Sequence, residues 1–130
     1  MIGISAEDTP NLIRQVRHGF SYQTLASFES ATGLRIPEVA DLIGIPSRTL
    51  ARRKAIGKLS PEESERLLRI SNLMGKAVEL FEGDSPAAVN WMSTPKAALD
   101  SQTPLEYSRT EVGAREVEDL IGRLEHGVFS

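Results

Sequence analysis

The sequence predicts an all-α fold, in which an N-terminal helix-turn-helix bundle is joined by a long helix to a small helical C-terminal domain. Apolar residues make up 40% of the 130 residues and recur at helical spacing rather than in alternation. Five of the seven prolines stand where a first helical turn would begin, a position at which the missing N–H is not needed. These prolines are Pro10, Pro37, Pro61, Pro86 and Pro104.

Four short helices are expected in the first half of the chain, over residues 10–18, 22–32, 37–43 and 47–56. Gly19 and Gly33 end the first two, because glycine accepts the left-handed conformation that follows many helices. The side chains expected on the inner faces of these two helices are Leu12, Ile13, Val16, Leu25 and Phe28.

The longest helix is expected to begin after Ser60 and to end at Gly83. Ser60 and Glu63 are spaced as a capping box, in which each side chain accepts a hydrogen bond from the other residue's backbone N–H. Thr103 and Glu106 repeat this spacing, and each box contributes about 1 kcal/mol to its helix. The apolar stripe of the long helix is Leu67, Ile70, Leu73, Met74, Ala77, Val78 and Phe81.

Three further helices are expected over residues 86–92, 104–109 and 111–126, with a turn around Thr94-Pro95 after the first of them. The last helix places its inward residues at helical spacing. These residues are Val117, Leu120, Ile121 and Leu124. The chain divides best inside the long helix or at Gly83.

Residues 36–54, with the sequence IPEVADLIGIPSRTLARRK, contain the parts of a helix-turn-helix in order. Gly44 is the turn residue, Ile45 fills the turn, and Leu50 anchors the second helix. The inner face of the supporting helix is formed by Val39, Ala40 and Ile43.

The second of these helices concentrates positive charge. Residues 48–58 hold five Lys or Arg residues and no acid, whereas a solubilising face normally mixes signs. We predict that Arg48 and Arg52 reach base edges and that the last three cations hold phosphates; the alternative is a solvated helix face. Because Arg53 occupies a position where an apolar residue usually packs, Ile56 is expected to serve as an anchor. The predicted DNA-contacting residues are Ser47, Arg48, Thr49, Arg52, Arg53, Lys54 and Lys58.

A domain of this size reads few base pairs alone. We therefore expect a homodimer that binds a palindromic operator, with half-sites one helical turn, about 34 Å, apart. Charge along the chain supports two surfaces for two partners, because residues 35–58 sum to +4 and residues 100–130 to −4, although the whole chain carries only −3.

Composition argues against several other classes of protein. The chain has no cysteine, which leaves out disulfides, thiolate metal sites and cysteine nucleophiles. No segment approaches the roughly 20 apolar residues of a membrane span, and the N-terminus does not resemble a signal peptide, so a cytoplasmic protein, at the nucleoid when DNA-bound, is expected. No phosphate-binding glycine loop, histidine cluster or buried carboxylate pair indicates an enzyme, a metal site or a cofactor site.

The last third of the chain resembles a known family. The residues that carry the resemblance, in order, are Trp91-Met92, Pro95, Ala98-Leu99, residues 103–106, Thr110, Gly113, Val117 and residues 120–129. They look like the toxin-binding domain of the Xre/MbcA/ParS-like antitoxins, and residues 50–70 are similar to the Xre/Cro-like helix-turn-helix half of the Xre branch. One departure is that many relatives carry a glycine pair where this chain has Asp100 and Ser101.

The resemblance implies a bacterial antitoxin of a type II toxin–antitoxin system. Its partner would be a RES-domain toxin that consumes NAD, and its N-terminal domain would repress its own operon. We accordingly predict a DNA-binding and dimerisation domain over residues 1–82, of which residues 1–19 are a helical extension, and a toxin-binding domain over residues 83–130.

The resemblance also suggests that the end of the last helix and the tail lie against the toxin and block its NAD pocket. Glu125 and the terminal carboxylate would compete for the cationic groups that bind the pyrophosphate, whereas the alternative is a frayed terminus. The predicted toxin-binding residues are Arg123, Glu125, His126, Gly127, Val128, Phe129 and Ser130.

Two residues of this region could be assigned a second role, in ligand stacking or in catalysis. Trp91 is better explained as a core residue than as a residue that stacks on a ligand. His126 lacks the acidic partner and the nucleophile that a catalytic base requires. Two other functions of the whole chain stay open: a stand-alone dimeric repressor with a C-terminal effector or oligomerisation domain, and a toxin-binding adaptor whose helix-turn-helix no longer contacts DNA.

Overall fold

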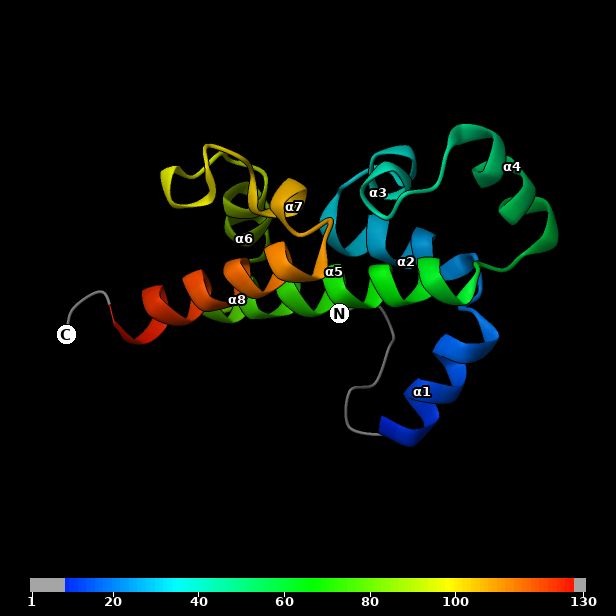
Figure 1. Ribbon diagram of the computed structural model, residues 1–130, viewed down its shortest axis with the longest axis horizontal. Coiled ribbons are helices and arrows are strands. Elements are labelled where there is room, and N and C mark those ends of the chain that lie inside the picture. The colour runs from blue at the N-terminus through cyan, green and yellow to red at the C-terminus, as the bar shows by residue number, and fades with distance from the viewer. Residues whose placement is uncertain (1–8, 128–130) are drawn as a thin grey trace. The chain divides into compact units, whose positions relative to one another are not determined.

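The computed structural model describes residues 9–127, and all regular structure in that range is helical, as predicted (Figure 1). Residues 1–68 and residues 69–130 form two compact units, so the division between them falls inside α5. The helices are α1 (Thr9–His18), α2 (Gln23–Thr32), α3 (Ile36–Leu42), α4 (Ser47–Ile56), α5 (Pro61–Leu80), α6 (Ser85–Met92), the 3-10 helix η1 (Ala97–Leu99), α7 (Pro104–Tyr107) and α8 (Glu111–His126).

The first helix matches its predicted range but buries less than expected. Leu12 and Val16 are half-buried, whereas Ile13 is 46% exposed, so the prediction that Ile13 faces inward is wrong. Gly19 ends α1 with a φ of +88°, and a Cβ at this position would overlap the carbonyl oxygen of Leu59. Only glycine therefore lets the end of α1 approach the segment before α5 this closely.

The core of the first unit is supplied by α2, α3, the turn after α3 and the beginning of α5. The carboxylate of Glu29 in α2 accepts a hydrogen bond from the backbone N–H of Ile36 at 2.9 Å and so connects α2 to the first turn of α3. Gly33 ends α2 with a φ of +80°, as predicted. The buried apolar residues of this unit are Phe20, Leu25, Phe28, Leu34, Val39, Ala40, Leu42, Ile43, Ile45, Leu59 and Leu67.

The first predicted capping box is complete. Ser60 Oγ accepts a hydrogen bond from the backbone N–H of Glu63 at 3.1 Å, and Glu63 Oε1 accepts one from the backbone N–H of Ser60 at 2.8 Å. The second box is half-formed: Thr103 Oγ1 accepts from the backbone N–H of Glu106 at 3.0 Å, but the Glu106 carboxylate lies 3.5 Å from Arg109 Nη1 instead. Both helices begin where the boxes predicted.

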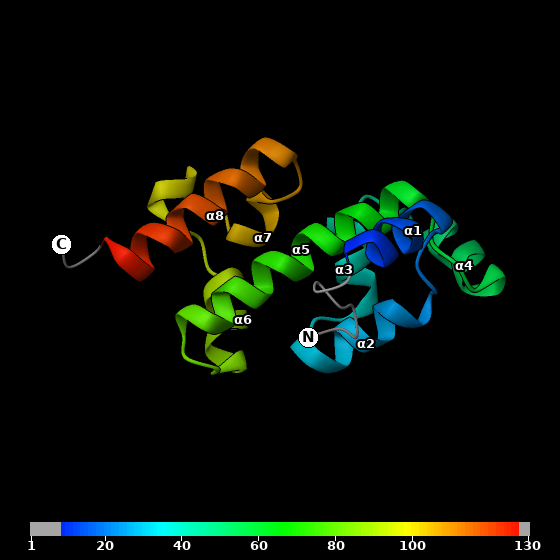
Figure 2. The ribbon, with the colours of Figure 1, turned by 90° about the horizontal axis from the view of Figure 1, so that it is seen from below.

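The second unit packs α6, α7 and α8 around residues from the later turns of α5. In both views α7 lies against the first turns of α8 (Figure 2). This approach depends on Gly113, since a Cβ there would overlap the carbonyl oxygen of Tyr107. The buried apolar residues of this unit are Ile70, Leu73, Met74, Ala77, Ala88, Met92, Leu99, Pro104, Leu105, Ala114, Val117 and Ile121.

The segment between α6 and α7 is more ordered than the single turn that the sequence predicted. It contains η1 and an isolated antiparallel bridge between Lys96 and Gln102. Asp100 and Ser101, inside this bridge, have φ values of +57° and +61°. Glycine adopts such values without steric strain, which explains why a glycine pair suits this position in the family that the sequence resembles.

Candidate functional site

The helix-turn-helix forms as its sequence predicted. Gly44, with a φ of +79°, turns the chain after α3, and the backbone N–H of Ile45 donates to the carbonyl oxygen of Ala40 at 2.8 Å. Ile45 is 4% exposed and fills the turn. Val39 and Ile43 are fully buried beside it, so α3 supports the turn from within the core.

Helix α4 projects a basic face into solvent. None of its ten residues is buried, and Gly57 ends it with a φ of +86°. Arg48 and Arg52, four residues apart, lie on the same side of the helix and are both exposed. Of the predicted DNA-contacting residues, only Thr49 and Arg53 are half-buried. Those that are exposed are Ser47, Arg48, Arg52, Lys54 and Lys58.

The side chains of the four exposed cations of this set, Arg48, Arg52, Lys54 and Lys58, make no hydrogen bond or ion pair with the part of the chain that the structure describes. Their charges are not compensated there by acidic neighbours. A helix that follows a tight turn, buries none of its residues and carries such a face is suited to enter the major groove of DNA and to contact phosphates.

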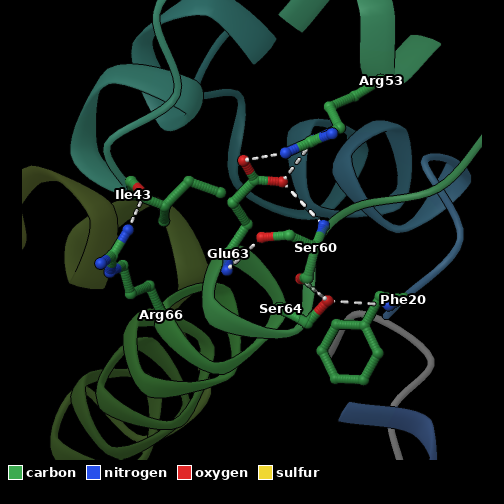
Figure 3. Close-up of polar contacts among 7 residues, drawn as sticks. All are labelled: Phe20, Ile43, Arg53, Ser60, Glu63, Ser64 and Arg66. Atoms are coloured by element: carbon green, nitrogen blue, oxygen red, sulfur yellow. Dashed lines mark hydrogen bonds and ion pairs between the residues drawn. The ribbon is translucent and has the colours of Figure 1, made fainter. Parts of the chain in front are cut away.

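Arg53 has a partner that the sequence did not predict. Its guanidinium faces α5, with Nε 2.9 Å from Glu63 Oε1 and Nη2 3.2 Å from Glu63 Oε2 (Figure 3). The prediction that Ile56 anchors the end of α4 is wrong, because Ile56 is 64% exposed. The half-buried side chains of Leu50 and Arg53 hold α4 instead, and Arg53 does so through an ion pair rather than through apolar packing.

The first two turns of α5 contact three other parts of the first unit through polar side chains (Figure 3). Glu63 holds Arg53 of α4, Ser64 Oγ accepts from the backbone N–H of Phe20 at 2.8 Å, and Arg66 Nη1 donates to the carbonyl oxygen of Ile43 at 3.3 Å. We call Glu63, Ser64 and Arg66 the α5 bracket. The bracket joins the segment before α2, the end of α3 and the basic helix α4 to one helix terminus.

The charge state of the bracket follows from its hydrogen bonds. Burial of the Glu63 carboxyl group acts to raise its pKa, but the hydrogen bonds from Arg53 and Ser60 outweigh burial and keep the pKa below its usual value. The hydrogen bond to Glu63 correspondingly raises the pKa of Arg53. Both groups are therefore charged at neutral pH. The sequence identified Glu63 only as a helix cap. The signal that could have revealed its second role was Arg53, because an arginine at a position that is usually apolar requires a charged partner.

In the second unit, an open groove of about 790 Å³ lies between α5 and α8. Lys76 Nζ and Glu118 Oε2 are 2.8 Å apart across it. Four of the predicted toxin-binding residues, namely Arg123, Glu125, His126 and Gly127, line this groove, whereas Val128, Phe129 and Ser130 lie outside the described residues. The remaining lining residues are Glu79, Asp119, Ile121 and Gly122.

Trp91 and His126 have different surroundings. Trp91 is half-buried, and Lys96 Nζ lies 4.7 Å from the centre of its ring, a distance typical of a cation–π contact. Burial lowers the pKa of Lys96. His126 is exposed at the end of α8, with Nε2 3.3 Å from Glu125 Oε1. Between residues 9 and 127 no three His, Asp or Glu side chains are grouped so that they could hold a metal ion.

No helix within the described range is long and apolar enough to cross a membrane. Among the described residues, the first unit exposes a basic helix and the second unit exposes a groove of mixed charge.

Comparison with known proteins assigns a family to each unit. Residues 12–72 match the antitoxin Xre-like helix-turn-helix domain, and residues 76–127 match the antitoxin Xre/MbcA/ParS C-terminal toxin-binding domain. The chain is 45% identical to an antitoxin Xre of Yersinia enterocolitica over 130 residues, which cover 99% of this chain and 88% of that protein. It is 32% identical to an antitoxin Xre of Photorhabdus laumondii with the same coverage, and 30% identical to one of Pseudomonas putida over 87% of this chain and 70% of that protein.

Proposed function

Because this chain belongs to the Xre antitoxin family, with its helix-turn-helix domain and its toxin-binding domain, we propose that it neutralises a RES-domain toxin that consumes NAD and represses its own operon. The observation that carries the proposal is the presence of both domains in one chain whose two units carry opposite net charge. The described part of residues 1–68 sums to +3 and that of residues 69–130 to −4, by count of Lys and Arg against Asp and Glu.

The DNA-binding half of the proposal rests on α4. Arg48 and Arg52 would read guanine edges in the major groove, with Ser47 and Thr49 nearby, and Lys54 and Lys58 would hold phosphates. A homodimer would place two copies of α4 in successive major grooves of a palindromic operator upstream of the gene. The proposed domain boundaries are those of the sequence: residues 1–82 for DNA binding and dimerisation, and residues 83–130 for toxin binding.

The toxin-binding half rests on the end of α8 and the tail. The groove between α5 and α8 is lined in part by four of the residues that the family resemblance assigned to the toxin. We expect Arg123, Glu125, His126 and Gly127 to contact the toxin, and Val128, Phe129 and Ser130 to enter and block its NAD pocket. A buried Phe at the centre of an interface is a common source of binding energy.

The first experiment tests neutralisation. The adjacent open reading frame is sequenced and expressed with and without this chain, and growth, cellular NAD and co-purification are measured. Full-length protein should bind the toxin and preserve NAD, whereas a chain lacking residues 128–130 should still co-purify but fail to preserve NAD. Unchanged neutralisation by the truncated chain would end the occlusion hypothesis, and absence of any co-purifying toxin would favour the stand-alone repressor.

The second experiment tests DNA binding. A gel shift with the 200 or so base pairs upstream of the gene is compared with a scrambled duplex of the same length, at several salt concentrations. The affinity for the upstream duplex should exceed that for the scrambled one and should fall with a log–log slope of about −0.9 per phosphate contacted. Equal and weak binding to both duplexes, together with toxin binding, would identify an adaptor that no longer contacts DNA.

A further inference from the structure

Arg53 lies in the middle of the basic stretch, yet its charge is directed into the protein. Its guanidinium makes two parallel hydrogen bonds to the Glu63 carboxylate, at 2.9 and 3.2 Å. The Arg53 side chain is 21% exposed and that of Glu63 only 8%. Paired hydrogen bonds of this kind fix the relative orientation of two planar groups, and not only their separation.

The Glu63 side of this pair is fixed in advance by its own helix. Glu63 Oε1 accepts from the backbone N–H of Ser60 as well as from Arg53 (Figure 3). The carboxylate is thus tied to the N-terminus of α5 by the capping box, independently of α4. Arg53 attaches α4 to a group that already has a defined position.

Helix α4 has few other side-chain attachments. None of its residues is buried, and of its last four residues only Arg53 is half-buried, whereas the other three are exposed. A ten-residue helix is marginal in water without tertiary contacts. The ion pair is therefore the side-chain polar contact that holds the second half of α4, while Leu50 supports the preceding turn. The C-terminal end of α4 is also attached through its backbone, because the N–H of Tyr22 donates to the carbonyl oxygen of Gly57 at 2.9 Å.

We propose that Arg53 is a positioning residue for DNA recognition rather than a phosphate ligand: its ion pair with Glu63 sets the orientation at which α4 presents Arg48 and Arg52 to the bases. This inference rests on the proposed DNA-binding function. It assigns a second task to the N-terminus of α5, which caps its own helix and orients the reading helix. It also divides the basic stretch into outward cations that contact DNA and one inward cation that aligns them.

The two roles of Arg53 predict opposite effects for Glu63→Gln. Glutamine also serves at this position of a capping box, so α5 keeps its cap while the charge that holds Arg53 is lost. If Arg53 positions α4, this variant should bind the upstream duplex at least tenfold more weakly, with unchanged affinity for a scrambled duplex. If Arg53 is a phosphate ligand, the variant should bind both duplexes more tightly, because a competing negative charge is gone, and that result would overturn the inference.

Two further variants complete the binding experiment. Arg53→Gln should reduce specific binding as much as Glu63→Gln, and the double variant should lose no more than either single variant, because both remove the same interaction. Glu62→Gln is the matched control: it removes the same charge from an exposed neighbour in the same helical turn. Its specific affinity should not fall, and a tenfold loss in this control would attribute the effect to charge alone and overturn the inference.

A measurement without DNA separates this inference from the proposed function. Amide hydrogen exchange on the full chain should be at least tenfold faster in residues 50–56 of Arg53→Gln and Glu63→Gln, with residues 25–32 of α2 unchanged and the Glu62→Gln control like wild type. Unchanged exchange in residues 50–56 would overturn the positioning role. If exchange is faster in the two variants but the wild type binds both duplexes equally, the DNA-binding function is overturned instead. The assignment of Arg53 to recognition is then overturned with it.

Discussion

Asp100 and Ser101 are consecutive residues in the left-handed region, with φ values of +57° and +61°. Their conformation is imposed by the loop around them, in which the backbone N–H of Ser101 donates to the carbonyl oxygen of Lys96 at 3.0 Å and the N–H of Lys96 donates to the carbonyl oxygen of Gln102 at 3.0 Å. A residue with a Cβ is strained there, and Asp tolerates the conformation better than Ser.

The first prediction follows from this strain. Ser101→Gly should stabilise the protein by about 0.5 to 1 kcal/mol, since relief of left-handed strain exceeds the greater backbone entropy that glycine brings to the unfolded chain. Asp100→Gly should act in the same direction but less strongly. The measurement is the free energy of unfolding by urea. Ala98→Gly, at an exposed position of η1 where φ is not positive, is the control and should destabilise; stabilisation by all three variants would contradict the explanation.

Two glycines of α8 should respond to alanine with opposite signs. A Cβ at Gly113 would overlap the carbonyl oxygen of Tyr107, so Gly113→Ala should destabilise the protein by about 1 to 3 kcal/mol. Gly122 has no atom within 4 Å of the position of a Cβ, so Gly122→Ala should stabilise by up to about 1 kcal/mol through helix propensity. Thermal unfolding of both variants beside wild type tests the pair, and equal shifts would show that the approach of α7 to α8 does not depend on Gly113.

The ion pair of Arg53 and Glu63 makes stability depend on pH in a defined window. The hydrogen bonds from Arg53 and Ser60 hold the pKa of Glu63 below the ordinary value of 4.5, so the native state favours the charged carboxylate. Its contribution to stability is complete above about pH 4.5 and is lost as the pH falls through the lower pKa of the folded state. Urea midpoints of wild type and Glu63→Gln should therefore differ most near pH 7 and converge once the pH has fallen below the lowered pKa of the folded state. A difference that stays constant with pH would mean that the carboxylate is not the group responsible.

The exposed cations of α4, together with Lys58 just after its end, should separate into two kinds by their effect on DNA binding. Arg48→Ala or Arg52→Ala should cost about 1 to 3 kcal/mol of specific affinity and relax the preference at one operator position. Lys54→Ala and Lys58→Ala should weaken binding to all sequences alike and reduce the salt slope by about 0.9 each. Fluorescence anisotropy with single-base operator variants measures both quantities. If all four substitutions changed only the salt slope, α4 would be a phosphate-binding helix and not a reading helix.

Helix boundaries were accessible from the sequence because they are decided within a few residues of the chain. The capping box at Ser60 predicted the start of α5, and Gly19 and Gly33 predicted the ends of α1 and α2 through the left-handed conformation that each adopts. The helix-turn-helix was accessible for the same reason, since Gly44 and Ile45 specify the turn locally. The prediction of the toxin-contacting residues, in contrast, depended on the family resemblance. The last three of these residues lie outside the described part of the chain.

The sequence alone specifies the succession of helices, the turn before α4 and the basic composition of α4. The packing of the helices selects which cations of α4 face outward, because the partner of Arg53 is ten residues away on another helix and its choice depends on the angle between α4 and α5. Tertiary structure likewise decided that Ile13 and Ile56 are exposed and that Gly113 is needed against Tyr107. Local patterns specify conformation through short-range sterics and hydrogen bonds, whereas the partners of side chains are specified by how helices distant in sequence pack.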